Sequence, residues 1–281
     1  MRILSISSQV AYGPVGNSAA VPALQAMGHE VLAIPTVMLS NHPGHGKPEG
    51  FRTSLEDLGN ILGALDTLGV LSGVGGVMTG YFASREQIET VATVLVRMKS
   101  AKPGIFILVD PVLGDEEGLY VPQAVADAIA THLLPLASCI TPNRFELAFL
   151  SGLEVTDGLS AVAAARHLRI AEVLATSIPA AGGELSTVLI TADGQHTITA
   201  PKLNQVPNGT GDFLSGLYLA ARENGSPHSA FTSAMATLNR AIALSAGTMV
   251  LDVAGALSTR AATQHTGLAH KDQRMTKDRS T

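Results

Sequence analysis

The sequence predicts an α/β fold in which helices cover both faces of a mostly parallel sheet. Short runs rich in β-branched residues alternate with longer runs of helical period along the 281 residues, which is the order of repeated βα units. Hydrophobic residues make up 46% of the chain, enough for a large core. No repeat or low-complexity linker divides it. We therefore expect one domain over residues 1–255 and a polar tail over 256–281.

The first βα unit shows the pattern. Residues 2–7 (RILSIS) are a short apolar run and predict a strand. Residues 17–27 predict a helix that begins at Asn17 and stops before Gly28, since glycine commonly follows the last turn of a helix. Residues 30–37 (EVLAIPTV) predict the next strand.

The middle of the chain continues the alternation. A helix is expected over 53–69 and a strand of small residues over 73–79. Residues 84–100 have the spacing of an amphipathic helix, and Ser84 can cap its first turn. The continuous apolar run 105–109 (IFILV) predicts a buried strand.

Helical periods and short strands continue towards the C-terminus. The remaining expected helices cover residues 122–133, 143–151, 158–169, 210–224 and 226–248. The remaining expected strands cover residues 171–175, 187–192 and 195–199. Two segments rich in glycine and proline, 40–50 and 178–186, are expected to be mobile surface loops.

Composition excludes several functional classes. The net charge of −5, with no basic stripe, argues against nucleic-acid binding. One cysteine, Cys139, excludes an intramolecular disulfide and a cysteine-based zinc cluster. The apolar runs are broken well before the length of a membrane span, and the first residues lack a secretory pattern. We expect a cytoplasmic protein that acts on small molecules.

The strongest chemical signal is Asn208-Gly209-Thr210-Gly211-Asp212, directly before an apolar helix. The glycines allow a ligand to approach the main chain, and the helix start offers N–H groups and the positive end of its dipole to a phosphoryl group. Asp212 could accept a proton from an attacking hydroxyl. The alternative is an ordinary turn in which Thr210 or Asp212 caps the helix.

A second signal lies in residues 141–146 (TPNRFE), at another helix start. Asn143 and Glu146 are three residues apart and share one helix face, where their oxygens could hold a hydrated magnesium ion. The alternative is a capping box, with Asn143 as N-cap and Glu146 bonding back to it. The three-residue spacing alone favours the capping box over the magnesium site.

Two further segments follow expected strands. Asp110 and Asp115 flank a turn at the carboxyl end of a buried strand, where α/β proteins bind ligands, although Asp-Pro also simply ends strands. Residues 8–17 (SQVAYGPVGN) offer small and polar groups to a polar aromatic ligand, or form a plain βα loop. His42 and His45 lack the spacing of helical metal ligands, so we expect them to contact solvent or substrate.

Absent motifs narrow the choice of enzyme. No G-x-x-x-x-G-K-[ST] occurs, which excludes a P-loop enzyme. Gly73, Gly75 and Gly76 lack the third glycine of a dinucleotide fingerprint, because residue 78 is Met. Neither G-x-S-x-G nor H-E-x-x-H is present.

With these segments in this order, the chain resembles the ribokinase-like superfamily and, within it, the pyridoxal kinases. The resemblance covers about residues 3 to 250. It rests on the segments SQVAYGPVGNSAAVPAL, PTVMLSNHPGHG, TGY, DPVLGD, YVP, TPNRFELAFLSG and NGTGD. The first two segments point to vitamin B6 rather than to sugars.

The resemblance implies a three-layer αβα sandwich, usually dimeric, that transfers the γ-phosphoryl group of MgATP to the 5′-hydroxyl of pyridoxal, pyridoxine or pyridoxamine. Asp212 then corresponds to the catalytic base, and the backbone of Gly209, Thr210 and Gly211 to the anion hole. The implied ligands of Mg²⁺ and a monovalent cation (K⁺ or Na⁺) are Asp110, Thr141 and Glu146.

The resemblance also assigns residues to the two substrates. The implied ATP-binding residues are Asp110, Asp115, Tyr120, Asn143, Glu146, Thr176, Ser177, Asn208, Gly209 and Gly211. The implied B6-binding residues are Ser8, Gln9, Val15, Val37, Leu39, His42, Tyr81 and Asp212, with residues 40–50 as a flap. Gln9 stands where many relatives have His, and Pro43 replaces a substrate-contacting threonine of some members.

Three other functions compete with this expectation. A hydroxymethylpyrimidine (phosphate) kinase of the same superfamily shares the GTGD motif and differs at the first loop. A non-catalytic B6-binding protein on a kinase scaffold would not need Asp212, Glu146 and the glycines. Sugar kinases usually carry more polar sugar contacts and a distinct lid domain.

Overall fold

A mixed sheet organises the computed structural model, which describes residues 1–258. In this part nine strands form one sheet in the order β11-β10-β9-β8-β5-β4-β1-β2-β3. The six strands from β9 to β2 are parallel, while β3, β10 and β11 pair antiparallel with their neighbours. The strands are β1 (Arg2–Tyr12), β2 (Glu30–Asn41), β3 (Gly50–Arg52), β4 (Val74–Thr79), β5 (Phe106–Val109), β8 (Cys139–Ile140), β9 (Glu172–Pro179), β10 (Glu184–Thr191) and β11 (Gly194–Pro201).

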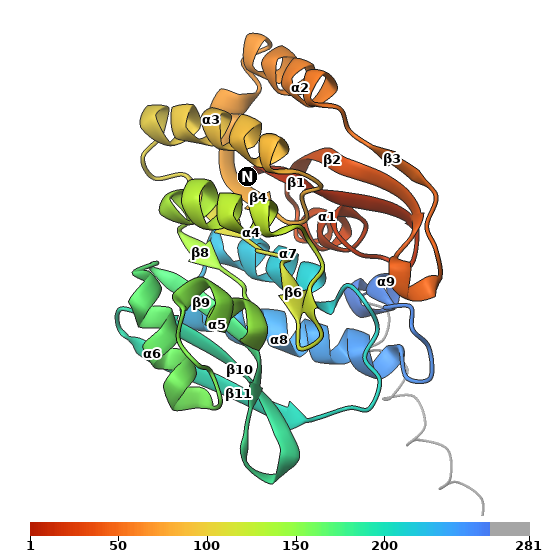
Figure 1. Cartoon of the computed structure of the whole chain (residues 1–281), viewed down its shortest axis with the longest axis vertical. Coiled ribbons are helices and arrows are strands. Elements are labelled where there is room, and N and C mark those ends of the chain that lie inside the picture. The colour runs from red at the N-terminus through yellow and green to blue at the C-terminus, as the bar shows by residue number, and fades with distance from the viewer. Residues whose placement is uncertain (259–281) are drawn as a thin grey trace, which may run out of the picture.

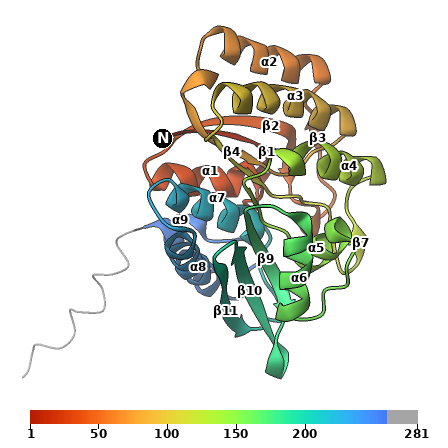
Figure 2. The ribbon, with the colours of Figure 1, turned by 90° about the vertical axis from the view of Figure 1, so that its left-hand side faces the viewer.

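Helices cover both faces of this sheet, as Figures 1 and 2 show. One face carries α1 (Asn17–Ala26), α7 (Thr210–Arg222), α8 (Pro227–Leu244) and α9 (Val253–Leu257). The other carries α2 (Leu55–Thr67), α3 (Arg85–Ala101), α4 (Gln123–Ala128), α5 (Arg144–Ser151) and α6 (Gly158–Leu168). The expected three-layer α/β sandwich is confirmed. No helix among residues 1–258 is long and apolar enough to cross a membrane.

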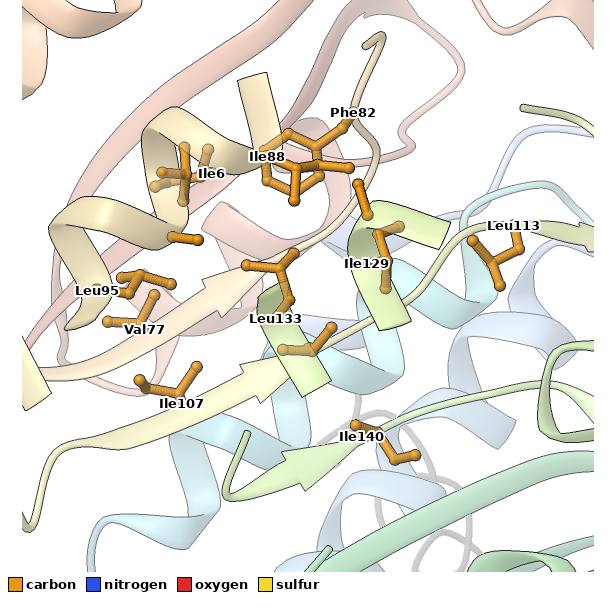
Figure 3. Packing of buried hydrophobic residues seen from close by; sticks show 14 of the residues in the cluster. Ile6, Val77, Phe82, Ile88, Leu95, Ile107, Leu113, Ile129, Leu133 and Ile140 are labelled. Atoms are coloured by element: carbon orange, nitrogen blue, oxygen red, sulfur yellow. The ribbon is translucent and has the colours of Figure 1, made fainter. Parts of the chain in front are cut away.

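Strand side chains alternate between two cores. Ile107 packs with the α2–α6 face, whereas its neighbour Leu108 packs with α7 and α8, because successive strand residues point to opposite faces. Figure 3 shows the first core, where Val77 and Ile107 from the sheet meet Leu95 from α3. The sheet is thus buried on both faces, which explains the continuous apolar runs.

Helix α7 is buried along most of its length. Residues 213–220 are all buried, the pattern of a helix enclosed on every side. Near its C-terminus, Tyr218 Oη donates to Glu172 Oε2 at 2.7 Å, and Arg222 Nη2 pairs with Glu172 Oε1 at 2.8 Å. These contacts hold the helix at the amino end of β9, so its N-terminus meets the carboxyl edge of the sheet.

The first two strands are longer than expected. β1 continues to Tyr12 and β2 to Asn41, with Tyr12 opposite Asn41, so much of the expected loop 8–17 is strand. A bulge after Ser7 shifts the register, and the Ser18 hydroxyl donates to Val10 O at 2.7 Å while accepting from Val10 N at 3.1 Å. These two hydrogen bonds with a helix side chain satisfy the backbone of β1 at Val10. The polar sequence of this stretch gives no sign of them.

Several other expectations need correction. Segment 178–186 is not a loop, because β9 and β10 extend into it and pair as an antiparallel hairpin. The helix expected over 122–133 ends at Ala128 and continues as a π turn and a 3-10 turn. The helix expected over 226–248 ends at Leu244. Short elements β3, β8 and α9 were not predicted, nor was a small ribbon of β6 (Gly114–Asp115) and β7 (Gly118–Leu119).

The C-terminal boundary also moves. The tail was expected from residue 256, yet Ala256 is fully buried within α9, which Asp252 caps by accepting from Gly255 N at 2.7 Å. Residues 259–281 lie outside the described part of the chain.

Asn17 begins α1 as expected but does not cap it. Gly16 occupies the N-cap position without a side-chain cap. The buried Asn17 amide instead accepts from Ser5 Oγ at 2.7 Å and donates to Ser7 O and Ile34 O at 3.2 and 3.3 Å. It therefore ties α1 to β1 and β2.

Candidate active site

The candidate site lies where the sheet changes its winding direction. From β1 the chain continues to β2 and β3 on one side, and from β4 it continues to β5, β8 and β9 on the other. The crevice between the carboxyl ends of two such strands is the usual ligand site of an open α/β sheet. Gly80 follows β4 at this point, and a Cβ added there would lie 3.9 Å from Asp212 Oδ1.

Asp212 is held at the first turn of α7. Desolvation is the larger effect on this carboxyl and raises the pKa of Asp212 to about 6. The backbone N–H groups of Gly16 and of Asp212 itself lower the pKa, because they favour the charged form. Because Gly209 is the N-cap, at φ +89°, and no side chain caps the helix, the alternative of a Thr210 or Asp212 cap is wrong.

The glycines of this motif let two loops meet. A Cβ on Gly209 would overlap Pro14 O and approach Val15 Cγ1 to 3.3 Å. A Cβ on Gly16 would overlap the carbonyl and the hydroxyl of Ser8. The chain between β1 and α1 therefore crosses directly over the start of α7.

A buried polar group beside Asp212 joins three elements. Ser215 Oγ lies 3.1 Å from Asp110 Oδ2 and 2.8 Å from Thr141 Oγ1, and Ser215 is fully buried. Asp110 and Thr141 were predicted, whereas Ser215 was missed. The signal was available, because residues 212 and 215 are three apart on one helix face.

The capping-box interpretation of Glu146 is confirmed. Its carboxylate accepts from Asn143 N at 2.9 Å and Asn143 Oδ1 accepts from Glu146 N at 2.9 Å, so the capping box is present. Its other oxygen accepts from Leu113 N at 2.7 Å. Burial raises the pKa of Glu146 to about 7, so the group is also a buried carboxyl facing the site.

The carboxyl and hydroxyl oxygens around Asp110 are chemically suited to bind a hard cation. Burial raises the pKa of Asp110 well above its usual range, and the charges of Asp212 and Glu146 raise it further. Among residues 1–258, no basic side chain forms an ion pair with any of these three carboxyls, and no cluster of three His, Cys, Asp or Glu is close enough to chelate a metal alone. Carboxylate and hydroxyl oxygens without counter-charge suit Mg²⁺ that retains water and phosphate ligands.

The residues expected to bind B6 lie along β1, β2 and the turn after β4. Ser8, Val15 and Val37 are buried, and Leu39 and Tyr81 are partly exposed. Tyr81 N donates to Ser7 Oγ at 3.2 Å, which fixes the turn beside Gly80. Gln9 Nε2 donates to Ser18 Oγ at 2.8 Å, so the amide of Gln9 is directed towards α1.

The segment expected as a flap forms a short cover over the loop before α1. Its tip is a 3-10 turn, Pro43–His45, in which His42 Nδ1 accepts from Gly44 N at 3.1 Å. His45 packs edge-on against Tyr12, with ring centroids 5.3 Å apart. A Cβ on Gly44 would lie 2.8 Å from Asn208 Nδ2, a buried amide without a partner. Burial lowers the pKa of His42, and the neighbouring His45 lowers it further.

The residues expected to bind ATP lie on the opposite side of Asp212. Asn143 pairs with Thr176 in a parallel bridge, so these two residues are neighbours. Ser177 has φ +59°, an uncommon backbone conformation for serine. Asp115 and Tyr120 bond to each other on the ribbon of β6 and β7, which Figure 1 shows beside α5.

A cavity in the structure lies away from this site. It has a volume of about 370 Å³ and lies at the amino ends of β4 and β5. Its lining includes Met98 of α3, Val74 of β4 and Leu71 in the turn before β4. It contains none of the predicted site residues and lies at the other end of the sheet from Asp212. Polar chemistry, rather than cavity size, locates the site.

Removing the buried charge of Asp110 should stabilise the fold and impair the site. The raised pKa of this carboxyl means that folding at neutral pH requires either a buried charge or proton uptake. We expect Asp110→Asn to raise Tm by about 2–4 °C, corresponding to roughly 1 kcal/mol, and to lower kcat/KM for ATP at least about tenfold.

Thermal scans and kinetics of Asp110→Asn beside Asp127→Asn check this, since Asp127 is exposed on α4. The folded-state pKa of Asp110 is raised, so the gain in Tm should shrink as the pH falls and the wild-type carboxyl takes up its proton. A lower Tm for Asp110→Asn at neutral pH would contradict the argument.

The fold and the Asp212 site define a ribokinase-like small-molecule kinase. A family model described as phosphomethylpyrimidine kinase matches residues 64–255. A curated relative, the pyridoxal kinase PdxY of Rubrobacter xylanophilus, is 37% identical over 227 residues, covering 78% of each chain. The pyridoxine/pyridoxal/pyridoxamine kinase of Bordetella avium is 35% identical over 75% of this chain and 74% of its own. The chain belongs to the pyridoxal kinase family.

Solved structures agree with this assignment. The pyridoxal kinase of Entamoeba histolytica matches with a TM-score of 0.86 and 28% identity, covering 91% of this chain and 94% of its own. The pyridoxal kinase of Leishmania donovani, solved with ADP and pyridoxine, matches with a TM-score of 0.85 and 31% identity over the same shares. The ribokinase-like fold predicted from the sequence is confirmed.

Proposed function

We propose that this protein transfers the γ-phosphoryl group of ATP to the 5′-hydroxyl of pyridoxal, and also accepts pyridoxine and pyridoxamine. The observation that carries the proposal is Asp212, a partly exposed carboxylate at the start of α7, a helix end that no side chain caps. Pyridoxal kinases that are similar over most of the chain support the choice of acceptor.

Asp212 acts as the general base. An alcohol is a weak nucleophile at neutral pH, and a carboxylate that accepts its proton as it attacks phosphorus typically accelerates the step about 10²–10⁴-fold. The pKa of about 6 leaves Asp212 ionised at neutral pH and makes it a stronger base than an ordinary aspartate. The amides at the start of α7 stabilise the charge that develops on the transferred group.

The site has two halves, one for each substrate. β1, β2 and the flap line one side of Asp212, and β8, β9 and the ribbon of β6 and β7 line the other. We assign the B6 ring to the first half and the nucleotide to the second. Asp110, Glu146 and Thr141 lie on the nucleotide side and would hold Mg²⁺ and a monovalent cation. Bound Mg²⁺ would neutralise phosphate charge, because no basic side chain in residues 1–258 forms an ion pair with these groups.

An ADP-release assay tests this function directly. With ATP and Mg²⁺, ADP release should depend on added pyridoxal, and phosphorus NMR should show a phosphate monoester on the 5′-oxygen. Hydroxymethylpyrimidine as the better acceptor would instead identify the rival kinase. Tight pyridoxal binding without ADP release would identify a non-catalytic binding protein.

The activity should depend on the ionisation of Asp212. Because its pKa is raised to about 6, the base is protonated below that pH and ionised above it. We expect kcat/KM for pyridoxal to fall about tenfold per pH unit below pH 6, with Glu146 near 7 adding a second, shallower decline. A profile that stays flat down to about pH 5 would exclude a base with this pKa.

The flap should exclude water from the reacting phosphate. A base next to ATP also activates water, and closure of a loop over the acceptor prevents that side reaction. Shortening the tip around Pro43–His45 should raise pyridoxal-independent ATPase activity several-fold, and an equal deletion in the exposed turn around Asp193 serves as control. Unchanged ATP hydrolysis would contradict a covering role.

Homodimer formation and a cytoplasmic location are part of the same proposal. Both follow from the resemblance to pyridoxal kinases, and exposed apolar side chains on α2 and β3, such as Leu55 and Phe51, support a self-association surface. Sedimentation velocity measures the oligomeric state. The flap over residues 40–50 and a catalytic domain that extends through α9 also belong to this proposal.

A further inference from the structure

The ribbon of β6 and β7 is too small to hold its own position. It contains two residue pairs, Gly114 with Leu119 and Asp115 with Gly118, and an isolated hairpin of this kind is marginal at best. It also stands apart from the main sheet. Its position must therefore come from contacts with its neighbours.

The base of the ribbon is fixed to the start of α5. Leu113 N donates to Glu146 Oε1 at 2.7 Å, and Asn143 Nδ2 donates to Gly114 O at 2.7 Å. Both partners belong to the capping box of α5. The tip of the ribbon, Glu116 and Glu117, lies about two residues beyond these two contacts. The capping box of α5 therefore does not support the tip.

One ion pair supports the tip. Arg144 Nε donates to Glu116 Oε1 at 2.7 Å, and Arg144 Nη2 pairs with Glu116 Oε2, so the guanidinium and the carboxylate meet through two parallel bonds. Arg144 Nη1 also donates to Val155 O at 2.9 Å. Arg144 is thus anchored to the body of the protein, and its fork fixes the tip in direction as well as distance.

The ribbon carries two groups of the nucleotide half-site. Tyr120 Oη donates to Asp115 Oδ2, and Glu117 N donates to Asp115 Oδ1 at 2.8 Å. The Tyr120 ring is 59% exposed, so its face is open to a ligand. Tyr120 N donates to Leu113 O at 2.8 Å, which fixes the Tyr120 backbone at the base of the ribbon. A tilt of the tip therefore moves Asp115 directly and acts on Tyr120 through the bond between its hydroxyl and Asp115. Ser8, Val37 and the flap lie on the far side of Asp212.

We infer that the Arg144–Glu116 pair is a positioning device for the nucleotide: it holds the β6–β7 ribbon against α5 and thereby sets the affinity for ATP without taking part in the chemical step. The inference rests on the proposed kinase function. Exposed ion pairs add little to global stability, so the pair should act on ligand affinity rather than on unfolding.

The experiment uses full-length Glu116→Gln and Arg144→Lys. Glu116→Gln keeps the shape of the side chain and loses its charge, while Arg144→Lys keeps the charge and loses the fork. We expect both to raise KM for ATP about 3- to 10-fold and to weaken binding of a fluorescent mant-ADP by the same factor. KM for pyridoxal and kcat should stay within about twofold of wild type, and Tm within about 1 °C.

Glu89→Gln is the matched control. It removes the exposed pair between Arg85 Nε and Glu89 Oε1, which has the same 2.7 Å distance but lies on α3. This variant should leave both KM values unchanged. Wild-type KM for ATP and wild-type mant-ADP affinity in Glu116→Gln would overturn the inference, as would an equal rise in KM for pyridoxal.

The two proposals fail in different ways. If wild-type protein releases no ADP with any B6 vitamer, the proposed function is wrong, and mant-ADP binding alone then decides the role of the pair. If wild type is active but Glu116→Gln binds mant-ADP normally, the kinase function stands and the positioning role is wrong.

Discussion

Replacing Asp212 by alanine or asparagine should lower kcat by at least about 10²–10⁴-fold and leave nucleotide affinity nearly unchanged. The carboxylate is the group placed beside Gly80, where the sheet changes its winding direction. Asparagine retains the shape but cannot accept the proton, so both variants should lose the chemical step. Steady-state kinetics and mant-ADP titration separate the two effects.

Asp193→Asn provides the control for Asp212→Asn. Asp193 lies in the exposed turn between β10 and β11, so the same chemical change there should leave kcat unaltered. Near-normal turnover in Asp212→Ala would remove this residue from the mechanism. Loss of mant-ADP binding in step with kcat would instead indicate a damaged fold, and Tm would reveal it.

Gly209→Ala should lower kcat/KM at least about 10²-fold, because displacing reacting groups by about 1 Å can have an effect of that size. Residue 209 has φ +89°, and its Cβ would overlap Pro14 O. The start of α7 and the loop before α1 must then separate, which moves the amides and Asp212 relative to Ser8. Kinetics with both substrates measure this loss.

Gly247→Ala distinguishes backbone strain from steric displacement. Gly247 has φ +82°, close to that of Gly209, but a Cβ there would meet no atom within 4 Å. Both variants introduce left-handed backbone strain of about 1–2 kcal/mol, and only Gly209→Ala also displaces a loop. Equal activities of the two variants would contradict the argument from close approach.

The sequence predicted the layers because burial leaves a periodic signal. The runs that became β4, β5, α3 and α7 are long or strongly apolar, and their period is the same in the folded chain as in isolation. The polar stretch after Ser7 lacks such a period. It becomes strand because Ser18, on α1, bonds to both backbone groups of Val10, a tertiary contact that no local pattern records.

The sequence likewise predicted one part of the candidate site and could not predict another. Asp212, Asp110, Thr141 and Glu146 stand in recognisable motifs and come together as expected. Gly80 and Ser7 could not be predicted as neighbours of Asp212, because their closeness depends on β1 lying next to β4 in the sheet. The role of Asn17 was also out of reach: it begins α1 as expected, but only the folded chain shows that its buried amide links α1 to β1 and β2.

The complete enclosure of α7 has a consequence for how such enzymes diverge. The residues that we propose for phosphoryl transfer stand at the start of a helix whose middle eight positions, 213–220, are buried, so almost any substitution in that stretch disturbs packing. The residues that face the acceptor lie on β1, β2 and a glycine- and proline-rich turn near the surface. Selection can therefore alter which alcohol is recognised by changing the outer strands and the turn, while the transfer chemistry is inherited intact.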